Sequence, residues 1–236
     1  MKRIWLLSLA TMMLGAAPTW AGDLVRPAME RFAQDTDETP NLRRHVIPLA
    51  GRLGCNGRAC HGSFQGQGGF RLSLFGYDFD ADHKALMGEE EPRIDLENPT
   101  KSLVLLKATT QEDHDGGKRL KLGTWQYRLM HKWIQSGAEN ISDDAPEFAS
   151  LEVVPKEIIF KKPGEKVRLQ VIVNWTDGSR EDVTCLSRFR TNNDQVATIS
   201  EDGLVTATKS GDTHVVAFYD NGIVPIPVMQ PISTKK

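Results

Sequence analysis

Three absences limit what this chain of 236 residues can be. It has only three cysteines, too few for the disulfide framework that small secreted domains use to reinforce a small core. It has no basic run, and its formal net charge is −2, so nucleic acid is not an expected partner. Beyond the N-terminal segment, no stretch approaches the roughly 20 apolar residues that span a bilayer, so we expect no transmembrane segment in the mature chain.

The N-terminal segment is typical of a secretory signal peptide. Lys2 and Arg3 form a positive start, residues 4–17 form a short apolar core, and Thr19 and Ala21 are the small residues that cleavage after Ala21 requires. We therefore expect residues 1–21 to be removed. The remaining, mildly acidic chain is expected to be exported to the periplasm or cell envelope.

Residues 22–140 carry the apolar spacing of helices. We expect a short helix after Pro48 and another that begins at the cap Thr124 and ends near Ser136. Between them lies a glycine-rich stretch that begins at Gly62. Glycines let the backbone pass close to a flat, bulky group, and the pattern as a whole predicts a mainly α domain.

The acidic residues 141–150 predict a linker, and the hydrophobic period changes after them. Residues 151–232 alternate apolar and polar side chains, with Val167, Leu169, Val171 and Val173 expected on one face of a strand. Residues 176–179 are typical of a hairpin turn. Short strands separated by such turns predict an all-β, Ig-like sandwich.

One motif carries most of the functional information. Cys55, Cys60 and His61 provide two thiols and an adjacent imidazole, which are the groups that attach a c-type haem and ligate its iron. The spacing is C-x4-C-H, two residues wider than the usual C-x2-C-H. Covalent haem attachment takes place outside the cytoplasm, so the export signal favours the same interpretation. We predict haem c bound covalently by Cys55 and Cys60, with His61 as the proximal iron ligand.

His114 is the predicted distal ligand. It lies in a polar, glycine-containing loop just before the last helix of the domain, and Asp113 or Asp115 is placed to orient its ring. A methionine ligand raises the redox potential, whereas a second histidine generally gives a lower one. The other candidates in the domain are His45, His83, His131, Met87 and Met130.

Two other interpretations of the motif remain open. An exported Cys55–Cys60 pair can form a disulfide, and the two thiols with His61 and His114 can bind zinc tetrahedrally. The zinc interpretation is awkward because the side chains of the neighbours Cys60 and His61 diverge. The third cysteine, Cys185, is expected to be a small buried apolar residue within the sandwich.

No catalytic site stands out in the sequence. Ser63 and Ser73 lie near His61, but no third group follows at a spacing that would complete a hydrolytic triad. We therefore do not expect an enzyme.

The motif and its surroundings resemble the cytochrome c-like N-terminal region of large exported proteins of planctomycete-type bacteria, over residues 44–49, 54–62, 68–76, 102–107 and 133–138. In related cytochrome modules a methionine loop precedes the final helix, and here residues 114–117 take its place, which implies bis-histidine ligation. The second domain resembles the bacterial Ig-like domain (group 2), over residues 191–199 and 202–207.

The sequence thus predicts an exported electron-transfer protein with an unidentified redox partner. Its Ig-like domain would be a spacer or a docking module for a protein or for the cell envelope. The alternative is a haem-free envelope binding or structural protein in which Cys55 and Cys60 form a disulfide.

Overall fold

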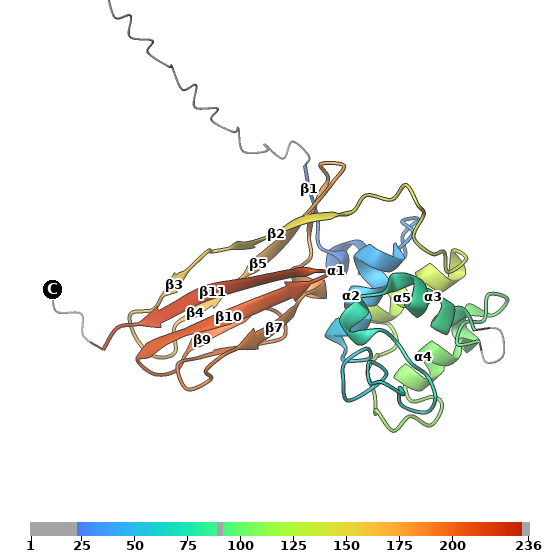
Figure 1. Ribbon diagram of the computed structural model, residues 1–236, viewed down its shortest axis with the longest axis horizontal. Helices are drawn as coiled ribbons and strands as arrows, with labels where there is room; N and C mark the ends of the chain where they lie inside the picture. The colour runs from blue at the N-terminus through green and yellow to red at the C-terminus, as the bar shows by residue number, and fades with distance from the viewer. Residues whose placement is uncertain (1–22, 89–91, 233–236) are drawn as a thin grey trace, which may run out of the picture.

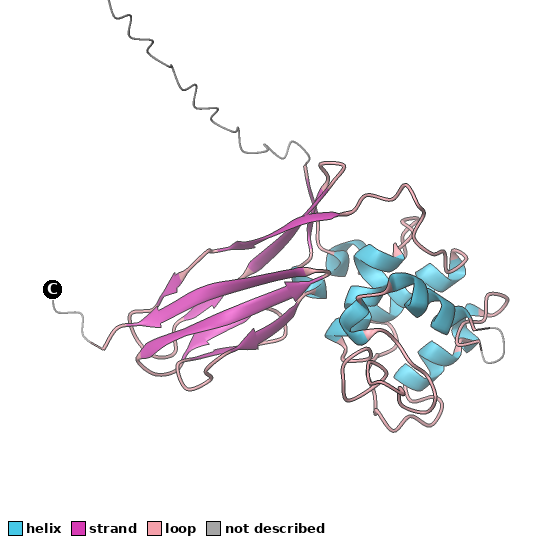
Figure 2. Ribbon diagram, in the orientation of Figure 1, coloured by secondary structure: helices cyan, strands magenta, loops and turns pink. Residues whose placement is uncertain are grey.

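The computed structural model describes residues 23–88 and 92–232, so the predicted signal peptide, residues 1–21, lies outside the described residues. A helical part and a β-sandwich lie side by side, and β2 (Phe148–Val154) leads from the first to the second (Figures 1 and 2). The predicted order, helices followed by an Ig-like sandwich, is confirmed. Within the described ranges, no helix combines the length and apolar character of a membrane span.

The helical part is built from short helices. A π-helical turn, η1 (Leu42–Val46), runs directly into α2 (Ile47–Arg52), so the expected helix begins one residue before Pro48 and holds this proline in its first turn, where no hydrogen bond is lost. The remaining elements are α1 (Ala28–Arg31), η2 (Leu74–Gly76), α3 (Phe79–Met87), η3 (Pro99–Lys101), α4 (Leu103–Ala108) and α5 (Trp125–Gln135).

Helix α5 supplies much of the core of this part. The Thr124 hydroxyl accepts a hydrogen bond from the Tyr127 amide, as its predicted role as a cap requires. The buried face of α5 consists of Leu129, Met130, Trp133 and Ile134. The helix is therefore held by an amphipathic face, which stabilises a helix of this length more than propensity does.

The sandwich is formed by three hydrogen-bonded groups of strands. The first has the order β1-β6-β5-β2, the second β3-β11-β10-β7 and the third β4-β9-β8. Besides β2, the strands are β1 (Leu24–Val25), β3 (Ile158–Ile159), β4 (Lys166–Arg168), β5 (Gln170–Trp175), β6 (Arg180–Asp182), β7 (Arg188–Thr191), β8 (Ala197–Ile199), β9 (Leu204–Ala207), β10 (Gly211–Tyr219) and β11 (Gly222–Gln230).

The prediction of a single strand over residues 167–173 is wrong in one respect. The chain changes sheets at Leu169, so Val167 belongs to β4 and pairs with β9, whereas Val171 and Val173 belong to β5 and pair with β2. The Leu169 amide donates to the Gly203 carbonyl at the crossing point. The alternation survives because both sheets face the same core, in which Leu169 is only 1% exposed.

The helical part and the sandwich share a sheet and a buried charge cluster. Strand β1, which precedes the first helix, pairs in parallel with β6 of the sandwich. Glu181 on β6 is 3% exposed, and its carboxylate accepts hydrogen bonds from Arg31 of α1 and from His45 of η1. The Asn41 amide donates to Nδ1 of His45, so in the neutral ring the proton lies on Nε2, which is 3.1 Å from the carboxylate.

A second set of contacts surrounds this cluster. Arg43 pairs with the buried carboxylate of Asp220, the Tyr219 hydroxyl donates to the Arg44 carbonyl, and the Arg44 guanidinium lies 4.3 Å from the ring centroid of Trp175. Cations, rings and a carbonyl from both parts therefore meet at one interface, which holds the sandwich in a defined orientation.

We expect Glu181→Ala to lower the free energy of unfolding by about 3 kcal/mol, because it leaves His45 buried without its acceptor and leaves Arg31 with Glu38 as its one carboxylate partner among the described residues. The measurement is urea unfolding at pH 7. Glu152→Ala is the matched control. The Glu152 side chain pairs with Arg180 but is 39% exposed, so its loss should cost less than about 1 kcal/mol. Equal losses in the two variants would contradict a structural role for the cluster.

Candidate functional site

The predicted site residues line one cavity in the helical part. Its volume is about 600 Å³, within the range of pockets that hold small molecules and cofactors. Cys55, Cys60, His61 and His114 all contribute to its wall. The apolar lining comes from Val46, Ile47, Ala50, Leu53, Phe70, Leu72, Leu86, Leu103, Val104, Ala108, Leu120 and Met130.

The wide cysteine loop is folded as successive tight turns. The Cys55 amide donates to the Ala50 carbonyl at the end of α2, and the Cys60 amide donates to the Gly57 carbonyl. The His61 amide then returns to the carbonyl of Cys55, at 2.9 Å. The two extra residues are therefore taken up within the loop, and the backbone of His61 comes back beside that of Cys55.

The glycine after the motif is a steric requirement. A Cβ at Gly62 would lie 2.1 Å from the backbone oxygen of Asn56, so only glycine allows this close approach of two backbone segments. The Leu72 amide donates to the carbonyl of His61 and ties the glycine-rich stretch back to the motif. The predicted close passage of a glycine backbone therefore takes place against the cysteine loop itself.

His61 is held by the segment that follows this glycine-rich stretch. Its Nδ1 lies 2.9 Å from the Phe70 carbonyl oxygen, which can only accept, so Nδ1 carries the proton and Nε2 keeps a free lone pair. Burial lowers the pKa of His61, the Phe70 carbonyl opposes this shift, and His114 adds to the lowering. The ring is therefore favoured in the neutral form that binds metals.

The His114 ring is also oriented by a backbone carbonyl. Its Nδ1 lies 2.8 Å from the Gly117 carbonyl, so here too Nε2 is left free. The orienting group is thus a backbone carbonyl, not the carboxylate of Asp113 or Asp115 that the sequence suggested. A Cβ at Gly116 would lie 2.8 Å from Cε1 of His114, so the loop wraps closely around its own imidazole.

The two imidazoles are stacked in the cavity. Their ring centroids are 6.2 Å apart, and the ring planes differ by 14°. Carbonyl groups that fix one ring nitrogen are the usual outer-shell partners of histidines that ligate metals.

The cavity offers two thiols, two imidazoles and a largely apolar wall of cofactor size, which are the kinds of group that a covalently bound haem uses. In the described ranges, no three His, Cys, Asp or Glu side chains are grouped so as to hold a metal ion between them.

All three cysteines are free thiols in the structure. Burial raises the pKa of Cys55 to about 11, with Arg119 opposing the shift, so this thiol is protonated at neutral pH. Burial also raises the pKa of Cys185 to about 11. Cys185 is 6% exposed and lies in η4 (Thr184–Leu186), as expected of a small buried residue of the sandwich.

The other ligand candidates lie in different surroundings, with one exception. His45 belongs to the Glu181 cluster, His83 bonds the Ala138 carbonyl, and His131 stacks on Tyr127. Met130 is 5% exposed and does line the cavity, so among those candidates it is the one that remains close to the predicted site.

Comparison with known proteins identifies part of the chain. Residues 147–223 match the bacterial Ig-like domain (group 2) family, which confirms the resemblance inferred from residues 191–207. The match leaves the helical part outside, so the cytochrome c-like resemblance and the domain boundaries stay predictions. A search of curated proteins gives no match.

Solved structures similar to this chain include two fragments of the S-layer protein SbsC. Its domains 4 and 5 are 17% identical, with a TM-score of 0.31 over 37% of this chain and 54% of that one. Its domains 5–6 are 18% identical, with a TM-score of 0.33 over 39% and 47%. This chain therefore spans about half the length of each.

We expect the histidines of the cavity and His45 of the Glu181 cluster to show opposite tautomers in the apoprotein. At pH 8, long-range ¹H–¹⁵N correlation spectra should show the proton on Nδ1 in His61 and His114, because each Nδ1 donates to a carbonyl. His45 serves as the internal control, since its proton should be on Nε2. Finding the Nε2–H form at His61 or His114 would contradict the free lone pairs assigned to the cavity.

Proposed function

We propose that the protein is an exported c-type cytochrome that transfers electrons. The observation that carries the proposal is the single cavity whose largely apolar wall brings together Cys55, Cys60, His61 and His114. A bound haem would supply a one-electron redox centre. The protein's part would be to hold it covalently, offer it imidazole ligands and exclude water.

The chain's own residues divide these tasks. The Cys55 and Cys60 thiols would hold the haem covalently, and His61 and His114 would supply imidazoles to its iron. The apolar side chains of the cavity lower the local dielectric, which strengthens any charge interaction within it. Lys107 also lines the cavity and brings positive charge that suits the carboxylates of a porphyrin.

A second candidate function rests on the family match. The match to the bacterial Ig-like domain (group 2) supports a haem-free envelope binding or structural protein more directly than it supports electron transfer, because it concerns the sandwich alone. Under either function, the sandwich is the part that would meet another protein or the envelope. The chemical state of Cys55 and Cys60 separates the two functions.

Haem attachment is tested by intact mass after expression in a bacterial periplasm that matures c-type cytochromes. We expect the polypeptide plus one haem, retained after acid–acetone extraction and denaturing electrophoresis. In Cys60→Ser, the haem can no longer be linked through both thiols, and at most one thioether remains. The matched control Cys185→Ser should keep the full mass. A polypeptide two hydrogens lighter, without absorbance in the Soret region, would instead support the haem-free protein with a disulfide.

The distal ligand is tested by His114→Ala. We expect the reduced protein to lose the sharp α and β bands of a low-spin, six-coordinate haem, because the opposite imidazole is removed. His131→Ala, a histidine stacked on Tyr127 outside the cavity, is the control and should leave the spectrum unchanged. An unchanged low-spin spectrum in His114→Ala would assign the position to another group, with Met130 the first to examine.

A further inference from the structure

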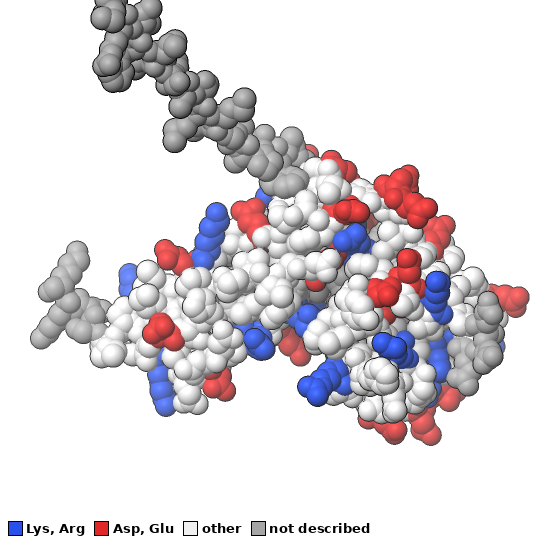
Figure 3. Space-filling view, in the orientation of Figure 1, with Lys and Arg blue, Asp and Glu red and all other residues white. Residues whose placement is uncertain are grey.

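A second hollow lies where the helical part meets the sandwich, away from the cysteines and His61. It is an open groove of about 700 Å³, lined by residues of α2, η2 and the segment after it on one side and of β7, β10 and their neighbours on the other. The surface is visibly hollowed between the two parts, with Lys or Arg side chains bordering the hollow (Figure 3). The groove exists because the buried Glu181 cluster and its surrounding contacts hold the two parts together.

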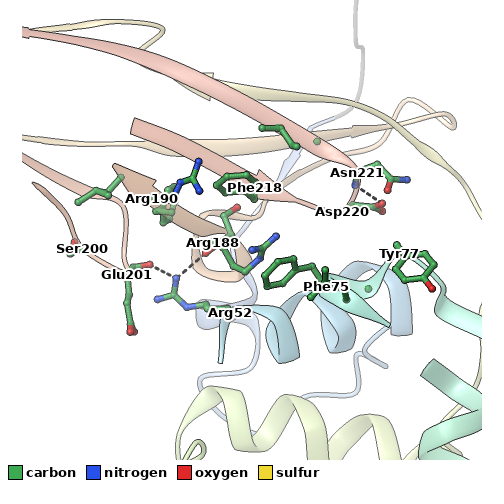
Figure 4. Close-up of a pocket in the computed structure, with 17 residues that line it drawn as sticks. Arg52, Phe75, Tyr77, Arg188, Arg190, Ser200, Glu201, Phe218, Asp220 and Asn221 are labelled. Atoms are coloured by element: carbon green, nitrogen blue, oxygen red, sulfur yellow. Dashed lines mark hydrogen bonds between the residues drawn. The ribbon is translucent and has the colours of Figure 1, made fainter. Parts of the chain in front are cut away.

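Arg188 is the central side chain of this groove. Its guanidinium lies 3.7 Å from the ring centroid of Phe75 and 5.1 Å from that of Phe218, between rings that belong to different parts of the molecule (Figure 4). Both rings favour a cation at their faces. In the portion of the chain that the structure describes, no carboxylate or carbonyl is bonded to this guanidinium, so its in-plane N–H donors have no protein acceptor.

Such an arginine is costly unless something else accepts its hydrogen bonds. Burial lowers the pKa of Arg188 from its ordinary value, which reports the loss of solvation that the charged group suffers. A planar guanidinium whose faces are covered and whose edge is open is suited to a carboxylate, which it can bind through two parallel N–H···O bonds.

The groove as a whole carries an excess of positive charge. Arg52 and Arg190 also line it, and Arg190 lies two residues from Arg188 on β7. Of the acidic groups in the lining, Asp220 is already paired with Arg43, and Glu201 is exposed beside Arg52. Arg188 and Arg190 are therefore left without a carboxylate partner of their own.

The apolar side chains of the groove are also unusually open. Phe75 is held in the left-handed backbone region, with φ of 57° and ψ of 22°, and its side chain is 43% exposed. This conformation is unfavourable for a bulky residue and is found most often at functional sites. Tyr77 and Ile223, on opposite sides of the groove, are each 66% exposed. Arginine with open aromatic residues is the composition of protein-binding hot spots.

We propose that this groove is a docking site for an acidic peptide segment of a partner protein, with a carboxylate on Arg188 and an apolar side chain against Phe75 and Tyr77. The site does not depend on haem. The occupant must present carboxylates and apolar side chains together, because the groove offers both arginines and open aromatic rings. A peptide can do this along a groove that runs between the two parts of the molecule. The Phe75 amide donates to the Asn56 carbonyl, so the groove wall is bonded directly to the loop between Cys55 and Cys60.

The test uses fluorescence anisotropy with the full mature chain and a fluorescein-labelled octapeptide of alternating Glu and Tyr. We expect saturable binding of this peptide, and Arg188→Gln should weaken it at least tenfold. A peptide with Gln in place of Glu should not bind. Arg188→Lys keeps the charge but loses the planar fork, so binding should be intermediate. Arg26→Gln, which removes a side chain 75% exposed and outside the groove, is the matched control and should bind like the unaltered protein.

Circular dichroism melting of each variant establishes that the protein is folded before binding is compared. Three results would overturn the proposal: no binding of the Glu peptide, equal binding of the Glu and Gln peptides, or equal affinity in Arg188→Gln and the unaltered protein. The Gln-peptide result would mean that the groove takes apolar side chains alone. None of these outcomes bears on haem attachment, so failure here leaves the proposed function untouched.

Discussion

The arrangement of the whole molecule depends on one buried carboxylate. Glu181 sits on a strand of the sandwich, yet its partners, Arg31 and His45, come from two helices of the other part. A buried charge is tolerated only where it is paired and hydrogen-bonded, so separating the two parts would expose three polar groups that fit each other. The interface is specific for this reason: an apolar contact of similar size would allow many relative orientations, whereas this one selects a single geometry.

The histidine pair shows a similar division between backbone and side chains. Neither imidazole in the cavity is oriented by an acidic side chain; Phe70 and Gly117 do it with their carbonyls. A carbonyl oxygen has no titratable proton, so it selects the Nδ1–H tautomer of the neutral ring. The orientation of the two rings is therefore a property of loop conformation, and a Cβ at position 62 or 116 would displace the backbone or the ring.

Much of the fold could be predicted from local pattern, and its failures have physical causes. The α5 helix, with its Thr124 cap, and the alternating strands are encoded by neighbours in sequence. The sheet change at Leu169 is invisible because both sheets bury the same face. Glu181 would be placed toward solvent by its charge, since its partners lie 136 and 150 residues away along the chain. The cysteine and histidine types were predictable, whereas the carbonyls that orient the rings depend on backbone paths that no residue type reports.

These constraints also relate the cavity to the groove. The Asn56 backbone accepts from Phe75 at the groove wall, and its own side chain is buried within the cysteine loop without a hydrogen-bond partner. A movement of Phe75 out of its unfavourable left-handed conformation would therefore pull on the loop between Cys55 and Cys60. The groove wall and the cysteine loop are thus joined by a direct backbone hydrogen bond, while the Glu181 cluster holds the sandwich against the helical part.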